Sequence, residues 1–107
     1  MHAFDIQVTE RPGRTVVALA GELDLATCTC VTEATAAIAL KDLSLVLELS
    51  ALTFLGPTGL NLLLGLRRRA RDEGGTLTLS GLPDQARRVL DLTGTRHLFA
   101  LCPRPAP

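Results

Sequence analysis

The segment of residues 45–71 constrains the fold more than any other part of the chain. Residues 45–49 read Leu-Val-Leu-Glu-Leu, a nearly continuous apolar run that is typical of strands buried on both faces. Over residues 59–71, leucines recur at the spacing of one helix face. Pro57 lies between the two patterns and disfavours helical dihedral angles in the residue before it, so the chain has to turn there. A buried strand that leads through a turn into an amphipathic helix indicates an α/β fold.

The residues before this segment have the pattern of two strands. Residues 4–9 alternate between apolar and polar side chains, which is the period of a strand with one buried face. Residues 11–14 contain Pro-Gly at the centre of a turn. Residues 15–20 form an unbroken run that suits a strand covered on both faces. Together they predict an antiparallel hairpin.

Helices and strands then alternate along the rest of the chain. A helix is predicted over about residues 27–40, with Asp24 or Thr27 as the cap of its first turn, and it crosses over to the strand at 45–49. The elements after residue 71 are a strand at 76–80, a short helix between Asp84 and Gly94, and a short strand at 98–101.

The element order predicts a single α/β domain over residues 1–102. Its helices pack on a mixed, mostly parallel sheet of four to five strands that begins with the N-terminal antiparallel hairpin. Residues 103–107 have proline at alternate positions and are expected to be a disordered tail.

Composition and charge narrow the range of partners. Apolar residues make up 47% of the 107 residues and three residues are aromatic, so one core of aliphatic side chains is expected. The formal net charge is zero, which gives no long-range field toward nucleic acid or an anionic membrane. Arginines crowd the end of the helix at 59–71, where cations are stabilising in any case, and base-stacking aromatics are scarce. We therefore predict a cytoplasmic protein that binds no nucleic acid and does not insert into a membrane.

Few residues could carry enzyme or metal chemistry. Cys28 and Cys30 would point about 200° apart on a helix, so they could not hold one metal ion together. With Cys102 they form an odd set, which we interpret as reduced, small apolar side chains. His2 and His97 lie far apart in the sequence and no nucleophile motif accompanies them. The sequence thus predicts no cofactor, no metal and no enzyme activity.

The hydroxyl of Thr58 allows two interpretations. As an N-cap it would accept a backbone N–H of the first helical turn, which is worth about 1 kcal/mol of helix stability. It would also lie at the carboxyl end of a buried parallel strand, where ligands collect in open α/β sheets, and at the positive end of a helix. A phosphoryl group on Thr58 would be stabilised there, and its negative charge would block a partner that docks on this surface.

Three stretches of the chain together carry a family pattern. They read GELDLAT at residues 21–27, LVLELSALTFLGPTGLNLLLGLRRRARDEGGTLTLSG at residues 45–81 and ARRVLDLTG at residues 86–94. In order and spacing they resemble the STAS domain of bacterial anti-sigma factor antagonists. This resemblance implies a domain that binds an anti-sigma factor of the histidine-kinase-like ATPase type and so frees the sigma factor. It further implies that this kinase phosphorylates a serine or threonine at the start of the second helix, the position that Thr58 occupies.

The resemblance also points to a docking surface for the anti-sigma factor. Glu22 and Asp24 match a loop that contacts the partner, although helix capping explains them equally well. Family members usually have Asp-Ser-Ser-Gly-Leu or Asp-Ser-Thr-Gly-Leu where residues 56–60 read Gly-Pro-Thr-Gly-Leu, so the acid and the first hydroxyl are missing here. The residues that we assign to partner binding are Glu22, Asp24, Gly56, Pro57, Gly59 and Leu60.

Two further alternatives stay open at this stage. Many family members continue into a helix after the last strand, so the strand at 98–101 could be exposed or could pair with another chain, and a homodimer is possible. The same resemblance also fits a STAS interaction module that is not phosphorylated, such as the small cytoplasmic subunit of a lipid-transport ABC complex.

Overall fold

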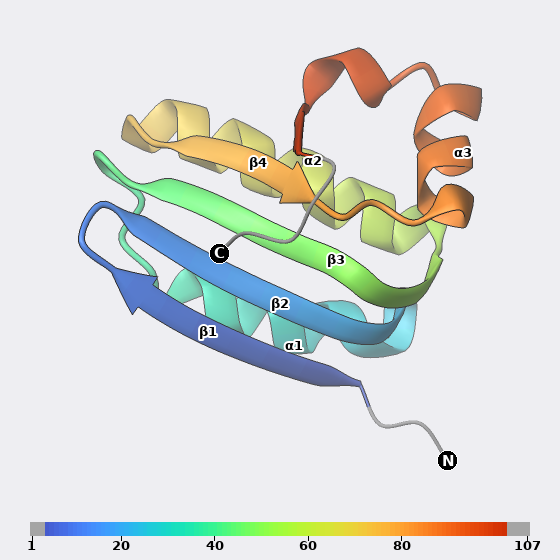
Figure 1. The fold of residues 1–107 in the computed structure, drawn as a ribbon, viewed down its shortest axis with the longest axis horizontal. Helices are drawn as coiled ribbons and strands as arrows, with labels where there is room; N and C mark the ends of the chain where they lie inside the picture. Colours follow the sequence, from blue (N-terminus) through green and yellow to red (C-terminus); the bar gives the residue numbers. More distant parts are fainter. Residues whose placement is uncertain (1–3, 103–107) are drawn as a thin grey trace.

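The strand order across the sheet follows the order of the chain. The computed structural model describes residues 4–102, in which five strands lie in the order β1-β2-β3-β4-β5 (Figure 1). β1 pairs antiparallel with β2, and β2, β3, β4 and β5 are parallel to one another. The elements are β1 (Asp5–Arg11), β2 (Arg14–Leu23), α1 (Leu25–Ala36), β3 (Ser44–Leu55), α2 (Pro57–Glu73), β4 (Thr76–Ser80), α3 (Asp84–Leu92), a 3-10 turn (Arg96–Leu98) and β5 (Ala100–Cys102). The predicted α/β class, mixed sheet and N-terminal hairpin are confirmed. The predicted tail at residues 103–107 lies outside the described residues.

The hairpin turns where the sequence predicts it. Arg11 pairs with Arg14 at the end of the ladder, and Gly13 between them has a φ of 73°. This left-handed conformation is open to glycine without steric cost, which explains why the turn can be so short.

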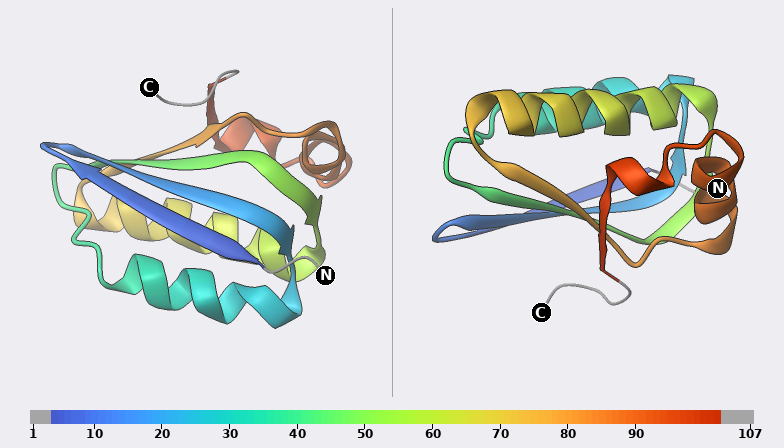
Figure 2. Two further views of the ribbon diagram at one scale, coloured as in Figure 1. Left: turned by 60° about the horizontal axis from the view of Figure 1, so that its bottom comes forward. Right: turned by 90° about the horizontal axis from the view of Figure 1, so that it is seen from above.

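α1 and α2 cover the same face of the sheet, as Figure 2 shows, while α3 lies beyond the ends of the strands. Right-handed crossovers that add β3 and then β4 on one side of β2 place their helices on one face. Val17 and Leu19 point to this face and are buried, whereas Val16 and Ala18 on the other face are partly exposed. The prediction that both faces of β2 are covered is therefore wrong.

Several predicted boundaries shift by a few residues. α1 ends at Ala36 instead of near residue 40, and β3 continues to Leu55 instead of ending at residue 49. Gly74 ends α2 as predicted, with a φ of 83°, and the leucines of β4 are more buried than its threonines. The extra length of β3 matters for function because it carries the chain past the end of β4 before α2 begins.

Two arginines of α2 have structural roles. The Arg69 side chain donates hydrogen bonds to the carbonyl oxygens of Thr35 and Ile38, at 2.8 and 2.6 Å, and so satisfies the C-terminal end of α1. Its Nε donates to Glu73 at 2.7 Å, and this hydrogen bond lowers the pKa of the Glu73 carboxyl. Arg67 Nε donates to a carbonyl oxygen just before β5 at 2.6 Å. Part of the arginine cluster thus joins elements of the fold and is not a free basic surface.

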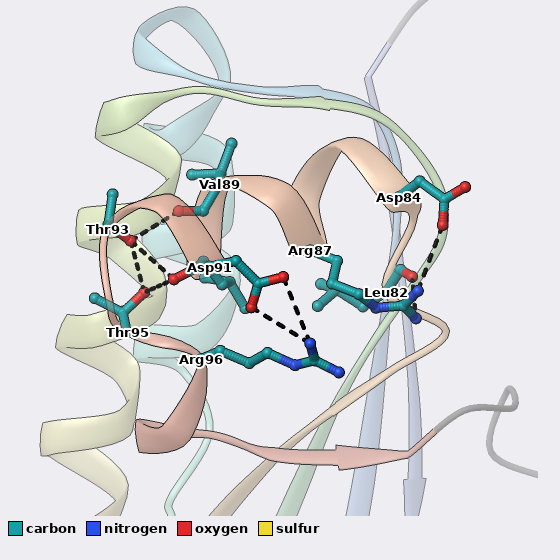
Figure 3. A network of polar contacts seen from close by, with 9 residues as sticks. Leu82, Asp84, Arg87, Val89, Asp91, Thr93, Thr95 and Arg96 are labelled. Carbon is teal, nitrogen blue, oxygen red and sulfur yellow. Dashed lines mark hydrogen bonds and ion pairs between the residues drawn. The ribbon is translucent and has the colours of Figure 1, made fainter.

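α3 and the turn after it are held by a polar network (Figure 3). Arg87 lies within 3.4 Å of the Asp84 carboxylate and of a backbone carbonyl before the helix. Arg96 pairs with Asp91 at 3.3 Å. The hydroxyls at the C-terminal end of the helix bond to each other and back to helix carbonyls. Both ion pairs are exposed, and each adds little stability by itself.

Cys28, Cys30 and Cys102 differ in exposure. Cys28 is buried, and its burial, with a smaller contribution from the Asp24 carboxylate, raises the pKa of its thiol. Cys30 is exposed on the same helix. Within residues 4–102, no group of three or more metal-binding side chains is close enough to hold an ion, and no helix there is long and apolar enough to cross a membrane.

Candidate functional site

The carboxyl ends of β2 and β3 meet where α1 and α2 begin. Leu23 and Leu55 lie side by side at the end of the β2–β3 ladder, and Asp24 and Gly56 follow them as the N-caps of α1 and α2. Two helix N-termini and two short loops therefore share one corner of the domain. This is the edge at which open α/β sheets collect ligands and partners.

Thr58 is not the N-cap of its helix, contrary to the prediction. Gly56 is the N-cap, with φ −94° and ψ 178°, and Pro57 occupies the first helical position. Proline fixes a φ near −65° and lacks the N–H that would be unsatisfied at this position, so it starts the helix before Thr58. Thr58 lies one residue further, inside the first turn.

The Thr58 side chain is partly exposed. Within residues 4–102, its hydroxyl makes no hydrogen bond to another residue, and the amide of Leu60 is the first in the helix to find an acceptor, the carbonyl of Gly56 at 3.0 Å. The amides of Thr58 and Gly59 lie before it, in the turn whose N–H groups have no partner inside a helix. A free hydroxyl thus lies beside unsatisfied backbone donors.

Asp24 supplies an acidic group directly over Gly56. A Cβ atom built on Gly56 would lie 2.3 Å from Oδ1 of Asp24, so the carboxylate fills the space of a side chain at position 56. Asp24 is held there as the N-cap of α1: its N–H donates to Thr27 Oγ1 at 3.1 Å, and that hydroxyl donates to the carbonyl of Glu22 at 2.6 Å. The capping interpretation of Asp24 is confirmed, and its carboxylate also lies next to the start of α2.

The predicted partner-binding residues differ in exposure. Gly59 packs so closely on β2 that an added Cβ would lie 2.4 Å from the carbonyl oxygen of Leu23, and Leu60 is part of the core. These two positions are buried, so they contribute to the corner through packing and not through exposed side chains. The exposed positions are Glu22 and Pro57, the partly exposed ones are Asp24 and Thr58, and the buried ones are Gly56, Gly59 and Leu60.

Two large apolar side chains at this corner were not singled out from the sequence. Leu25, the first residue of α1, is 76% exposed, and Phe54, which pairs with Glu22 across the ladder, is 40% exposed. A hollow near the carboxyl ends of β2 and β3 is lined by Phe4, Gly21, Glu22, Thr27 and Thr53. Exposed apolar side chains with a polar rim are typical of protein interaction surfaces. We call the set Glu22, Leu25, Phe54, Pro57 and Thr58 the corner surface.

Gln85 also positions this corner and was missed from the sequence. Its side-chain amide accepts the N–H of Leu55 at 2.8 Å and donates to the carbonyl of Leu55 at 3.1 Å. β4 ends at Ser80, so the amide of Gln85 takes the place of a neighbouring strand for the last residue of β3. A glutamine in the first turn of a helix has no sequence signal that reveals such a partner.

We expect Gln85→Glu to destabilise the domain by about 1–3 kcal/mol, because the lost N–H donor leaves two oxygens facing each other. The midpoint of urea unfolding measures this change. Arg88→Gln on the same helix is the control, since Arg88 is exposed and makes no hydrogen bond to another described residue. Equal unfolding midpoints for the two variants would contradict the role of Gln85.

Fold and corner together define a STAS domain: the family model described as "Mlab, STAS domain" matches residues 6–101, and the chain belongs to this family. The anti-sigma-B factor antagonist of Bacillus subtilis (strain 168) is 24% identical over 96 residues, which cover 90% of this chain and 88% of that protein. An anti-sigma factor antagonist from Mycobacterium paratuberculosis superimposes with a TM-score of 0.81 at 30% identity, covering 94% of this chain and 86% of the other. The antagonist SpoIIAA in its unphosphorylated form gives a TM-score of 0.73 at 22% identity, with 94% and 88% coverage. These relatives are regulators by name, in agreement with the prediction that the chain is not an enzyme.

Proposed function

We propose that this protein is a cytoplasmic anti-sigma factor antagonist, which binds a kinase-type anti-sigma factor through the corner surface and thereby frees a sigma factor. The observation that carries this proposal is the free, partly exposed hydroxyl of Thr58 in the first turn of α2, in a chain similar to proteins named anti-sigma factor antagonists. Leu25 and Phe54 would supply the apolar contact with the partner, and Glu22 a charged contact at its rim.

We further propose that phosphorylation of Thr58 ends this interaction. The amides of the first turn of α2 favour a phosphoryl group at this position. The Asp24 carboxylate above Gly56 opposes it, because it brings a like charge to the same corner. The phosphorylated corner would therefore be strongly negative, and a partner that buries it would have to cover an unpaired charge.

The phosphorylation test uses purified protein, ATP and each kinase-type anti-sigma factor encoded by the source organism. Intact-mass spectrometry is expected to find one added phosphate in the parent and none in Thr58→Val, which keeps the shape of the side chain without the hydroxyl. Thr53→Val is the matched control, because Thr53 is an exposed threonine near the same corner and should leave the modification in place. A phosphate that persists in Thr58→Val would contradict the assignment.

A second function is supported by the composition of the same loop. Gly56 has no side chain and Pro57 no N–H, so two groups that could orient an acceptor hydroxyl are missing. A STAS module that binds its partner without phosphorylation, such as the small cytoplasmic subunit of a lipid-transport ABC complex, fits this loop. Affinity capture from the source cells separates the two: retention of a transporter ATPase favours the second function, and retention of an anti-sigma kinase favours the first.

A further inference from the structure

The outer edge of β1 is a second candidate interaction surface. Within residues 4–102, β1 pairs with β2 alone, so one side of its backbone faces away from the sheet (Figure 1). Every residue of the strand except Ile6 is exposed, and the central residue, Val8, keeps 43% of its surface exposed. Such an edge is a template for pairing with another strand.

The charges of β1 lie near its ends and differ in sign. The strand reads Asp-Ile-Gln-Val-Thr-Glu-Arg, so Asp5 begins it, Glu10 and Arg11 end it, and residues 6–9 carry no charge. Charged residues in the middle of a strand are a common protection against edge pairing, and β1 has none there. Side chains alternate between faces along a strand, so Asp5 and Arg11 share one face and Glu10 lies on the other. The face with Asp5 and Arg11 has an uncharged centre between opposite charges and is complementary to itself in the antiparallel direction.

From this pattern we propose that β1 pairs with β1 of a second copy of this chain, antiparallel and with the two-fold axis at Val8. The register places Val8 opposite Val8, Gln7 opposite Thr9, Ile6 opposite Glu10 and Asp5 opposite Arg11 of the other copy. Directly opposite residues share a face, so Val8 packs against Val8 on the helix side, where its neighbour Val17 belongs to the core. Asp5 and Arg11 form opposite-charge pairs on the other side, at both ends of the joint strand pair.

Other arrangements of the two strands lose these contacts. In parallel pairing in register, Asp5 would lie beside Asp5 and Arg11 beside Arg11, which is repulsive. Along β1, the N–H and C=O groups of alternate residues point away from β2 and toward β2. In an antiparallel register shifted by one residue, a residue whose groups point away from β2 would lie opposite a residue whose groups point toward its own β2, so the two could not form hydrogen bonds. A shift by two residues would separate both the charges and the valines. Charge complementarity therefore selects one register and one partner, a second copy.

The oligomeric state measured by sedimentation velocity over a wide range of protein concentration tests this proposal. The parent is expected to shift from the 11.4 kDa monomer to a dimer as the concentration rises. Asp5→Arg and Arg11→Asp each place like charges opposite each other at two sites and should raise the dimer dissociation constant at least about tenfold.

Charge exchange makes the test specific for the register. An equimolar mixture of Asp5→Arg and Arg11→Asp should form a mixed dimer, since each chain then opposes the other sign, and the double variant should dimerise like the parent. Circular dichroism checks that every variant is folded. A parent that stays monomeric would overturn the proposal and leave the edge to solvent or to a different protein. A dimer that is unaffected by either single change would overturn it as well, because its interface would lie elsewhere.

Discussion

Gly59→Ala is expected to lower the free energy of unfolding by about 3 kcal/mol, because the new methyl group has no room. Its carbon would lie 2.4 Å from the backbone oxygen of Leu23 and 2.8 Å from Cδ1 of Leu55, and real Cβ contacts are not that short. The backbone of β2 cannot move away without breaking its ladder with β3, so α2 has to shift. For a domain of this size the melting temperature should fall by roughly 10–20 °C.

Gly65→Ala is the matched control for this change. Gly65 lies in the same helix and is exposed, and a Cβ built on it meets no atom within 4 Å. Alanine is the better helix former by about 1 kcal/mol, so this variant should be as stable as the parent or more stable. Thermal unfolding followed by circular dichroism compares the two. If the melting temperature of Gly59→Ala equalled that of Gly65→Ala, the close contact between α2 and β2 would not be a constraint on the fold.

Thr58→Glu is expected to weaken binding to the anti-sigma partner at least about a hundredfold, which corresponds to roughly 2.7 kcal/mol. The glutamate places a negative charge in the first turn of α2, next to the Asp24 carboxylate, and a partner that covers the corner would bury this charge without a counter-ion. Isothermal titration calorimetry with the purified partner measures the loss. A glutamate carries less charge than a phosphate, so the phosphorylated protein should bind more weakly still.

Thr76→Glu controls for the charge itself. Thr76 is exposed at the start of β4, and the amino ends of the parallel strands lie at the edge of the sheet opposite to the corner surface. Its binding should equal that of the parent. Unchanged binding by Thr58→Glu would place the docking surface elsewhere on the domain.

The sequence predicted the architecture because local patterns determine it. Alternation in β1, the apolar run at the start of β3 and the leucine spacing of α2 each report one element, and right-handed crossovers then leave few ways to arrange them. The shift of the N-cap from Thr58 to Gly56 shows the limit of this reasoning. Both residues are acceptable caps, and the choice depends on the fixed dihedral angle of Pro57 between them.

The details of the corner depend on contacts between residues far apart in the chain. Gln85 bonds to Leu55 across 30 positions, and the Asp24 carboxylate occupies the space above Gly56. No periodicity or motif marks such pairs, because they arise only when the sheet brings the strand ends together. The exposed side chains of Leu25 and Phe54 were hidden for the same reason, since each lies in a pattern that reads as part of a buried face.

The loop that carries Thr58 is fixed at both ends before any partner arrives. Gln85 holds Leu55, the N–H of Gly56 donates to the carbonyl of Leu23 at 3.0 Å, and Pro57 removes freedom from the backbone between them. Little conformational entropy is then left to lose when the corner is covered. Complexes formed on so rigid a surface should therefore owe their affinity to long residence times, with association limited by diffusion and orientation and not by a search for the bound shape.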